Sequence, residues 1–209
     1  MASSGYTGEM DKHFNTAGPG KPDLHYQIDP LTRVDLEEVA SLIDLERYFV
    51  LHAPRQTGKT TCLLALRDYL NAQGRYAALY VNVETGQARR NDLSAAMLGI
   101  ASQLAEKAAE SLRHGSLQAE LMALACSIDG SDVLRRLLRS IASAADKPVV
   151  LFLDEVDALV GDTLISVLRQ IRAGYTDRPK HFPQTIVLCG VRDVRDYRLT
   201  RPDGEVITG

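Results

Sequence analysis

The 209-residue sequence contains no tryptophan, only three cysteines and no long apolar segment. Cys62, Cys126 and Cys189 are far apart, so no pair has metal-ligand spacing, and the odd number argues against a disulfide framework. We therefore expect three buried or half-buried thiols in a cytoplasmic protein. Because a membrane-spanning helix needs roughly 20 predominantly apolar residues, we also expect that the chain does not cross a membrane.

The sequence also lacks a large excess of charge of either sign. It carries 24 basic and 27 acidic side chains, a net charge of −3. This balance gives no general attraction to nucleic acid or to anionic membranes, although it leaves a local basic patch open. The length accommodates one α/β domain with a core, plus a tail.

Apolar runs and helical patterns alternate along the chain. Short runs rich in strand-forming residues predict four buried strands, at residues 48–52, 77–83, 148–153 and 185–189. Apolar residues at helical spacing predict helices at residues 34–47, 60–71, 93–112, 117–126, 132–144 and 163–173. Strands that alternate with helices predict an α/β fold in which a parallel sheet is covered on both faces.

A phosphate-binding pattern lies between the first predicted strand and the next helix. Residues 53–60 read Ala-Pro-Arg-Gln-Thr-Gly-Lys-Thr, which fits Gly or Ala, four residues, then Gly-Lys-Thr. In such a loop the backbone N–H groups form an anion site, and the helix N-terminus adds partial positive charge. A chance match in a chain of this length has a probability on the order of 1–2%. A surface turn that merely has this sequence is therefore the weaker interpretation.

Several residue types in this loop suit Mg-ATP. Gly58 lets the backbone approach the phosphates, Lys59 can reach the β- and γ-phosphates, and the Thr60 hydroxyl can bind Mg²⁺. Alanine in place of the usual first glycine is a familiar variant. We expect the following residues to contact the nucleotide: Ala53, Pro54, Arg55, Gln56, Thr57, Gly58, Lys59, Thr60 and Thr61.

Two carboxylates follow the most apolar predicted strand. Asp154 and Glu155 come directly after Leu153, and ligands of open α/β sheets bind at the carboxyl ends of the strands. We expect Asp154 to hold Mg²⁺ through water and Glu155 to accept a proton from the attacking water. Taken alone, the pair could simply mark a strand leaving the core. The phosphate loop favours the functional interpretation, because each motif explains the other.

Three further polar residues each have more than one possible role. Arg192 follows the fourth strand, where it could report on the γ-phosphate or simply pair in solvent with Asp193 or Asp196. Glu84, after the second strand, is a rival for the catalytic base, although we favour Glu155. Asp157 could support the metal site or cap the next helix, and we favour the cap.

The phosphate loop, the segment Leu-Phe-Leu-Asp-Glu-Val-Asp and the segment Leu-Cys-Gly-Val-Arg-Asp together resemble the AAA-like ATPase domains of bacteria and archaea. The Gly-x-Arg ending of the fourth strand is similar to that of signal-transduction ATPases with numerous domains. Over residues 24–200, this resemblance implies a three-layer α/β/α P-loop fold with strand order 5-1-4-3-2. It also implies Lys59 and Thr60 on the phosphates and metal, Asp154 on Mg²⁺, Glu155 as base and Arg192 as a sensor.

Other residues near these motifs have weaker signals. Arg33, His25 and Tyr26 precede the first strand, where an adenine could pack, but ordinary packing is favoured. Arg172 and Arg178 lie where ring-forming ATPases often place an arginine that reaches a neighbouring subunit. We expect both to be plain surface residues here.

The ends of the chain differ from its centre. Residues 1–22, rich in Ser, Gly, Thr and Pro, predict a flexible tail without a core of its own, and residues 23–200 predict the ATPase domain. Residues 201–209 are polar and turn-prone, and neither the usual fifth strand nor a helical lid is recognisable. We expect either truncation before a lid or further domain, or a reduced version of the fold.

Three functions are compatible with these motifs. The first is an ATPase that drives conformational change in attached domains or partners, including copies of itself. The second is a signalling switch that hydrolyses ATP slowly or not at all. A small-molecule kinase is disfavoured, since the Asp-Glu pair would activate water beside its phosphoryl donor. The sequence leaves a role for nucleic acid open.

Overall fold

The computed structural model describes residues 12–15, 18–21, 23–84, 92–159, 161–191, 199–200 and 206–207. Its centre is a parallel sheet of four strands, β1 (Phe49–His52), β2 (Ala77–Asn82), β3 (Val149–Asp154) and β4 (Thr185–Gly190). Their order is β1-β4-β3-β2. This confirms the predicted α/β class and the predicted order of these four strands.

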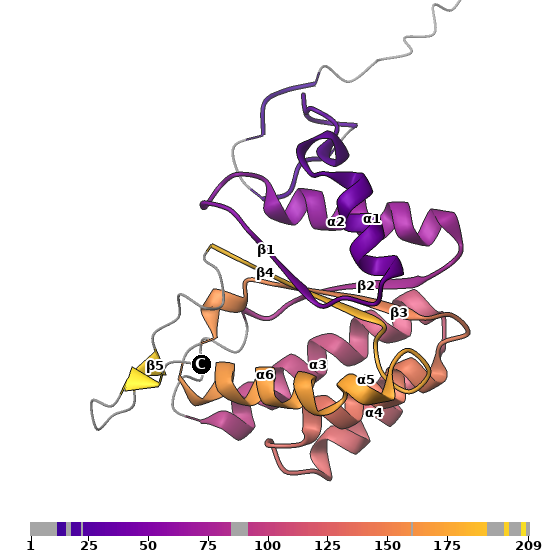
Figure 1. The fold of residues 1–209 in the computed structure, drawn as a ribbon, viewed down its shortest axis with the longest axis vertical. Coiled ribbons are helices and arrows are strands. Elements are labelled where there is room, and N and C mark those ends of the chain that lie inside the picture. Colours follow the sequence, from indigo (N-terminus) through magenta and orange to yellow (C-terminus); the bar gives the residue numbers. More distant parts are fainter. Residues whose placement is uncertain are drawn as a thin grey trace, which may run out of the picture.

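Helices cover both faces of the sheet, with α1 and α2 on one side and α3 to α6 on the other (Figure 1). The α-helices are α1 (Leu36–Asp44), α2 (Lys59–Gln73), α3 (Leu93–Leu112), α4 (Leu117–Cys126), α5 (Val133–Ala144) and α6 (Asp162–Ala173). The short 3₁₀ helices are η1 (Pro30–Arg33), η3 (Val156–Ala158) and η4 (Tyr175–Asp177). The predicted three-layer arrangement is therefore present.

Some elements differ from the sequence prediction. The first α-helix is shorter than residues 34–47, since it runs from Leu36 to Asp44. Asp35 could cap its start on sequence grounds, and its carboxylate does so by accepting from the Glu38 N–H at 3.0 Å. After β4, the short strands β5 (Leu199–Thr200) and β6 (Val206–Ile207) pair in a separate antiparallel sheet, which we did not predict. Of the three thiols, that of Cys126 is exposed rather than buried.

Strand β3 separates two hydrophobic cores. All six of its residues are buried, and successive side chains of a strand point to opposite faces. Leu151 and Leu153 accordingly belong to the larger core, with α3 to α6, whereas Phe152 belongs to the smaller core, with α1 and α2. The same alternation directs Asp154 toward the face on which α2 begins.

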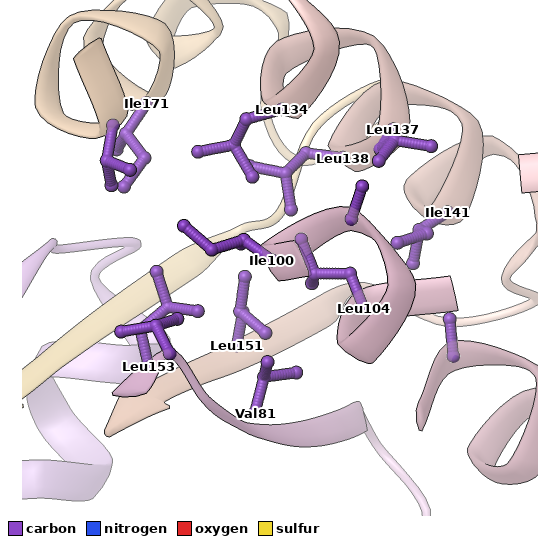
Figure 2. Close-up of a cluster of buried hydrophobic side chains, with 14 of the residues drawn as sticks. Val81, Ile100, Leu104, Leu134, Leu137, Leu138, Ile141, Leu151, Leu153 and Ile171 are labelled. Atoms are coloured by element: carbon purple, nitrogen blue, oxygen red, sulfur yellow. The ribbon is translucent and has the colours of Figure 1, made fainter. Parts of the chain in front are cut away.

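Figure 2 shows part of the larger core, where strand side chains meet those of the helices. The labelled residues are Val81, Leu151 and Leu153 from the strands, Ile100 and Leu104 from α3, Leu134, Leu137, Leu138 and Ile141 from α5, and Ile171 from α6. Burying one such side chain stabilises a fold by about 1.5–3 kcal/mol. This layer therefore holds the sheet in a fixed position beneath the polar residues at its carboxyl edge.

Within the described residues, no helix combines the length and apolar character needed to cross a membrane.

Candidate nucleotide-binding site

The connection from β1 to α2 is a compact loop whose backbone requires glycine at one position. Gly58 has a φ of +81°, and a Cβ atom there would lie 2.6 Å from Nη1 of Arg33. Helix α2 follows at once, since the Cys62 N–H donates to the Gly58 carbonyl at 3.0 Å. The N–H groups of the first helical turn are thus presented at the end of this loop.

Lys59 folds back over the loop that precedes it. Its Nζ donates to the carbonyl oxygens of Ala53 at 2.9 Å and of Pro54 at 3.0 Å. The Thr57 hydroxyl also donates to the Pro54 carbonyl, at 2.8 Å. Because anionic oxygens accept from an ammonium group more strongly than neutral carbonyls do, a phosphate group could draw Lys59 away from these acceptors.

The Asp154 carboxylate joins the phosphate loop to the sheet. The side chain is fully buried, and its Oδ2 accepts from the Thr60 hydroxyl at 2.7 Å and from the Tyr80 hydroxyl at 2.9 Å. Its Oδ1 accepts from the Glu155 N–H at 2.9 Å. The structure therefore brings together Thr60 and Asp154, the two residues predicted to hold a metal ion.

Glu155 lies directly beyond the strand, in a conformation that few residues adopt. Its φ is +58°, and its side chain lines the same cavity as Lys59 and Thr60. Partial burial raises the pKa of Glu155, and the Asp154 and Asp157 carboxylates raise it further, while Lys59 opposes them.

Glu84 is near Glu155 but is presented differently. Its carboxylate makes a small contribution to the raised pKa of Glu155, yet its side chain is exposed and is not part of the cavity wall. This placement favours Glu155 over Glu84 as the residue that faces a ligand.

A cavity of about 830 Å³ lies beside the phosphate loop. Residues 56–61 and Glu155 form one part of its wall, and the N-terminal arm, defined as residues 18–21 and 23–33, forms the other. The Gly20 N–H donates to the Thr61 hydroxyl at 3.2 Å, which attaches the arm to α2. The volume of the cavity lies within the range typical of small-molecule sites.

The contribution of the arm was missed in the sequence, where residues 18–21 were assigned to a tail. Gly18, Pro19 and Gly20 line the cavity, together with Ile28 and Pro30. The signal that could have suggested this is the Gly-Pro-Gly turn, which allows close approach of the backbone. The boundary of the tail at residue 22 stays a prediction.

The first three residues of the phosphate loop, Ala53, Pro54 and Arg55, lie outside the wall of the large cavity. The Ala53 N–H donates to the Gly190 carbonyl at 3.3 Å, which links the start of the loop to the end of β4. The carbonyls of Ala53 and Pro54 nevertheless hold Lys59. Arg192, the predicted sensor, lies outside the described residues.

Asp157 does not cap the next helix, so that prediction was wrong. Its Oδ1 accepts from the Val191 N–H at 2.8 Å, whereas Gly161 occupies the cap position of α6. The carboxylate is committed to the end of β4 because η3 turns it toward the neighbouring strand. Asp157 thereby fixes the backbone next to the predicted sensor.

The residues considered for adenine separate into two groups. Arg33 lines the large cavity. His25 and Tyr26 instead contact the rings of His13 and Phe14, at centroid distances of 4.9 and 5.4 Å, and neither lines this cavity.

Arg178 is not a plain surface residue, contrary to prediction, while Arg172 is exposed as predicted. The Arg178 guanidinium lies 3.5 Å from the Tyr175 ring centroid and 4.8 Å from that of Tyr48. Its N–H groups donate to the carbonyls of Glu46, Tyr175 and Gln184. These contacts place it at the amino ends of β1 and β4, away from the phosphate loop.

The sequence signature of the AAA domain family (AAA_22) matches residues 43–197. The chain belongs to the AAA domain family. AAA domains are P-loop domains and generally ATPases, so membership implies nucleotide binding of the kind common to the family. No curated protein is significantly similar to this AAA domain in sequence.

Solved structures similar to this AAA domain include two from Drosophila, of ORC bound to poly(dA/dT) DNA and Cdc6 and of ORC bound to GC-rich DNA and Cdc6. Each matches with a TM-score of 0.49 and 16% identity over 79% of this chain. The chain spans 25% of the length of either matched chain. At this distance the likeness assigns no function.

Proposed function

We propose that this AAA domain binds Mg-ATP, hydrolyses it to ADP and phosphate, and thereby drives conformational change in attached domains or partners. The observation that carries the proposal is the 2.7 Å hydrogen bond from the Thr60 hydroxyl to the Asp154 carboxylate. It joins the phosphate loop to the acidic end of β3. Thr60, Lys59 and Glu155 line the adjacent cavity, whereas Asp154 is buried next to Thr60 and is not part of the cavity wall.

The side chains around this bond fit the proposed ligand. Mg²⁺ prefers oxygen ligands and keeps several waters, and Thr60 and Asp154 offer a hydroxyl and a carboxylate. Thr60 would bind the ion directly and Asp154 through a water molecule. When bound, Mg²⁺ neutralises charge on the β- and γ-phosphates. The absence of a side chain at Gly58 lets a phosphate approach the backbone on the side where the Arg33 guanidinium lies.

The chain's own residues would carry the reaction as follows. The Lys59 ammonium moves from the Ala53 and Pro54 carbonyls to the phosphates. Glu155 accepts a proton from a water that attacks the γ-phosphorus, while the bond from that phosphorus to the bridging oxygen breaks. The raised pKa of Glu155 brings its basicity closer to neutral pH. Arg192 would stabilise charge on the transferred group.

Steady-state ATP turnover and nucleotide binding, measured together, test this proposal. Glu155→Gln preserves the shape of the side chain but removes the base, so it should bind Mg-ATP normally and lose turnover. Glu84→Gln is the matched control and should retain turnover. Loss of turnover in Glu84→Gln alone would transfer the role of base to Glu84.

The main alternative is a nucleotide-dependent signalling switch. Wild-type protein that binds Mg-ATP without turnover would support the switch and contradict the ATPase. Transfer of the γ-phosphate to a small molecule, in place of phosphate release, would indicate a kinase. Turnover stimulated by DNA, with a steep salt dependence, would identify nucleic acid as a partner.

A further inference from the structure

Tyr80 approaches the proposed metal site from the neighbouring strand. It lies on β2, where Tyr80 is aligned with Phe152 and Asn82 with Asp154. Its hydroxyl reaches toward the carboxyl end of β3 and donates to Oδ2 of Asp154 at 2.9 Å. Tyr80 does not line the large cavity, so it would act on a ligand there through the side chains that its hydroxyl contacts, which are Asp154 first and Thr60 second.

The hydrogen bonds of Asp154 show what this contact does. A carboxylate offers about four acceptor positions. Two hydroxyls, from Thr60 and Tyr80, occupy Oδ2, and one N–H, from Glu155, occupies Oδ1. Of these three strong donors, only one is on Oδ1. The thiol of Cys189 also hydrogen-bonds this carboxylate, but a thiol is a weak donor, so a water could replace it on Oδ1.

We propose that Tyr80 is a positioning residue, which fixes the plane of the Asp154 carboxylate so that Oδ1 accepts from a water bound to Mg²⁺. This inference rests on the proposed function of the site. Without the Tyr80 hydroxyl, Thr60 alone would hold Oδ2, and the carboxylate could rotate about its Cβ–Cγ bond. Side chains that orient a metal ligand commonly change metal affinity by roughly 10- to 100-fold.

A second tyrosine–aspartate pair in the same core provides a matched control. The Tyr76 hydroxyl donates to Oδ1 of Asp44, and Tyr76 lies just before β2. Both tyrosines pack in the smaller core, but the Tyr76 pair is at the opposite end of β2 from Asp154. Tyr76→Phe therefore removes the same chemical contact without touching the proposed site.

The experiment compares the affinity for a fluorescent ATP analogue in Mg²⁺ with that in EDTA. The dissociation constant in EDTA divided by that in Mg²⁺ is the factor by which the metal strengthens nucleotide binding. Tyr80→Phe should reduce this ratio by roughly tenfold and leave affinity in EDTA unchanged. Tyr76→Phe should retain the wild-type ratio. A wild-type ratio in Tyr80→Phe, with both variants folded, would overturn the inference.

The wild-type protein separates failure of this inference from failure of the proposed function. If the wild type binds nucleotide equally well in Mg²⁺ and EDTA, the proposed role of Mg²⁺ fails, and this inference with it. If the wild type gains affinity from Mg²⁺ and Tyr80→Phe gains as much, only the role of Tyr80 fails.

A second variant covers the case in which Tyr80→Phe does not fold. In an Asp154→Asn background the buried charge is gone, so loss of the hydroxyl donor is less costly. If Tyr80 acts through Asp154, adding Tyr80→Phe to this background should not change the EDTA/Mg²⁺ ratio further. A further reduction would show that Tyr80 acts by another route and would overturn the inference.

Discussion

At the amino ends of the parallel strands, polar side chains bond to other parts of the protein, whereas at the carboxyl ends they surround a cavity. Arg178 at the amino end packs against two tyrosine rings and donates to backbone carbonyls. At the carboxyl end, Lys59 and Glu155 line a cavity of about 830 Å³. The same sheet is thus closed by its own contacts at one end and open to a ligand at the other.

This difference between the two ends of the strands predicts that stability and nucleotide binding can be changed separately in this fold. Substitutions at the amino end should lower the free energy of unfolding and leave nucleotide affinity unchanged. Substitutions at the carboxyl end should mainly lower nucleotide affinity or turnover. The following variants test this contrast, from the largest expected effect to the smallest.

Lys59→Ala should have the largest effect and should act on binding. Removing the ammonium group eliminates charge-assisted contacts to two phosphates, so we expect nucleotide affinity to fall by roughly 100-fold. Titration calorimetry with Mg-ATP measures this change. Lys147→Ala, at an exposed lysine before β3, should bind like wild type. Undiminished affinity in Lys59→Ala would contradict the proposed site.

Arg178→Ala should act on stability. The variant loses its contacts with two tyrosine rings and leaves the part-buried carbonyls of Glu46 and Gln184 with fewer donors, so we expect a loss of about 2 kcal/mol in the free energy of unfolding. Urea denaturation measures the loss, and Arg178→Lys should recover only part of it, because lysine lacks the planar group. A change in nucleotide affinity instead would break the contrast between the two ends.

Asp157→Ala should act on turnover through the end of β4. Loss of the acceptor for the Val191 N–H costs about 1 kcal/mol, and the freed backbone should lower the rate about fivefold by displacing the residues that follow. Steady-state phosphate release measures the rate. Asp157→Asn keeps an acceptor oxygen and should stay close to wild type. Equal rates in the two variants would argue that the hydrogen bond from the Val191 N–H to Asp157 does not affect turnover.

The smallest effect concerns pH and the amino end. The Tyr76 hydroxyl is the main cause of a lowered pKa at Asp44, and Arg75 lowers it further. A carboxyl whose pKa is lower in the folded state stabilises the protein above its unfolded pKa, near 3.8, and loses this contribution as pH falls further. Since the side chain is 47% exposed, we expect only a few tenths of a kcal/mol.

Thermal unfolding of wild type and Asp44→Asn, followed from pH 6 to pH 3, checks this point. The wild type should lose slightly more stability than Asp44→Asn over this interval. A larger loss in Asp44→Asn would mean that the pKa is raised and not lowered.

The strands and most helices could be predicted because their apolar residues recur with the period of the element. The link between Thr60 and Asp154 could be anticipated, since both the loop and the acids have recognisable patterns. The arm at Gly18 to Gly20 could not, because a polar Gly/Pro segment has no period that indicates a partner.

Other features depend on tertiary contacts that no local pattern encodes. Asp157 was assigned to a cap because its partner, the Val191 N–H, follows a strand that is distant in sequence. Tyr80 looked like any strand aromatic, since alternation gives the face of a side chain but not the atom that it reaches. Arg178 was misjudged because its acceptors are backbone carbonyls from three segments.

The pairing of β1 has a consequence for the order of assembly. Among the described residues, β1 hydrogen-bonds to β4 and to no other strand of the sheet. During synthesis the phosphate loop therefore emerges early but has no neighbouring strand until β4 inserts between β1 and β3. The phosphate loop should therefore be among the last parts of the molecule to form. Local detachment of β1, which lies at the end of the sheet order, would disrupt the loop before the rest of the fold is lost.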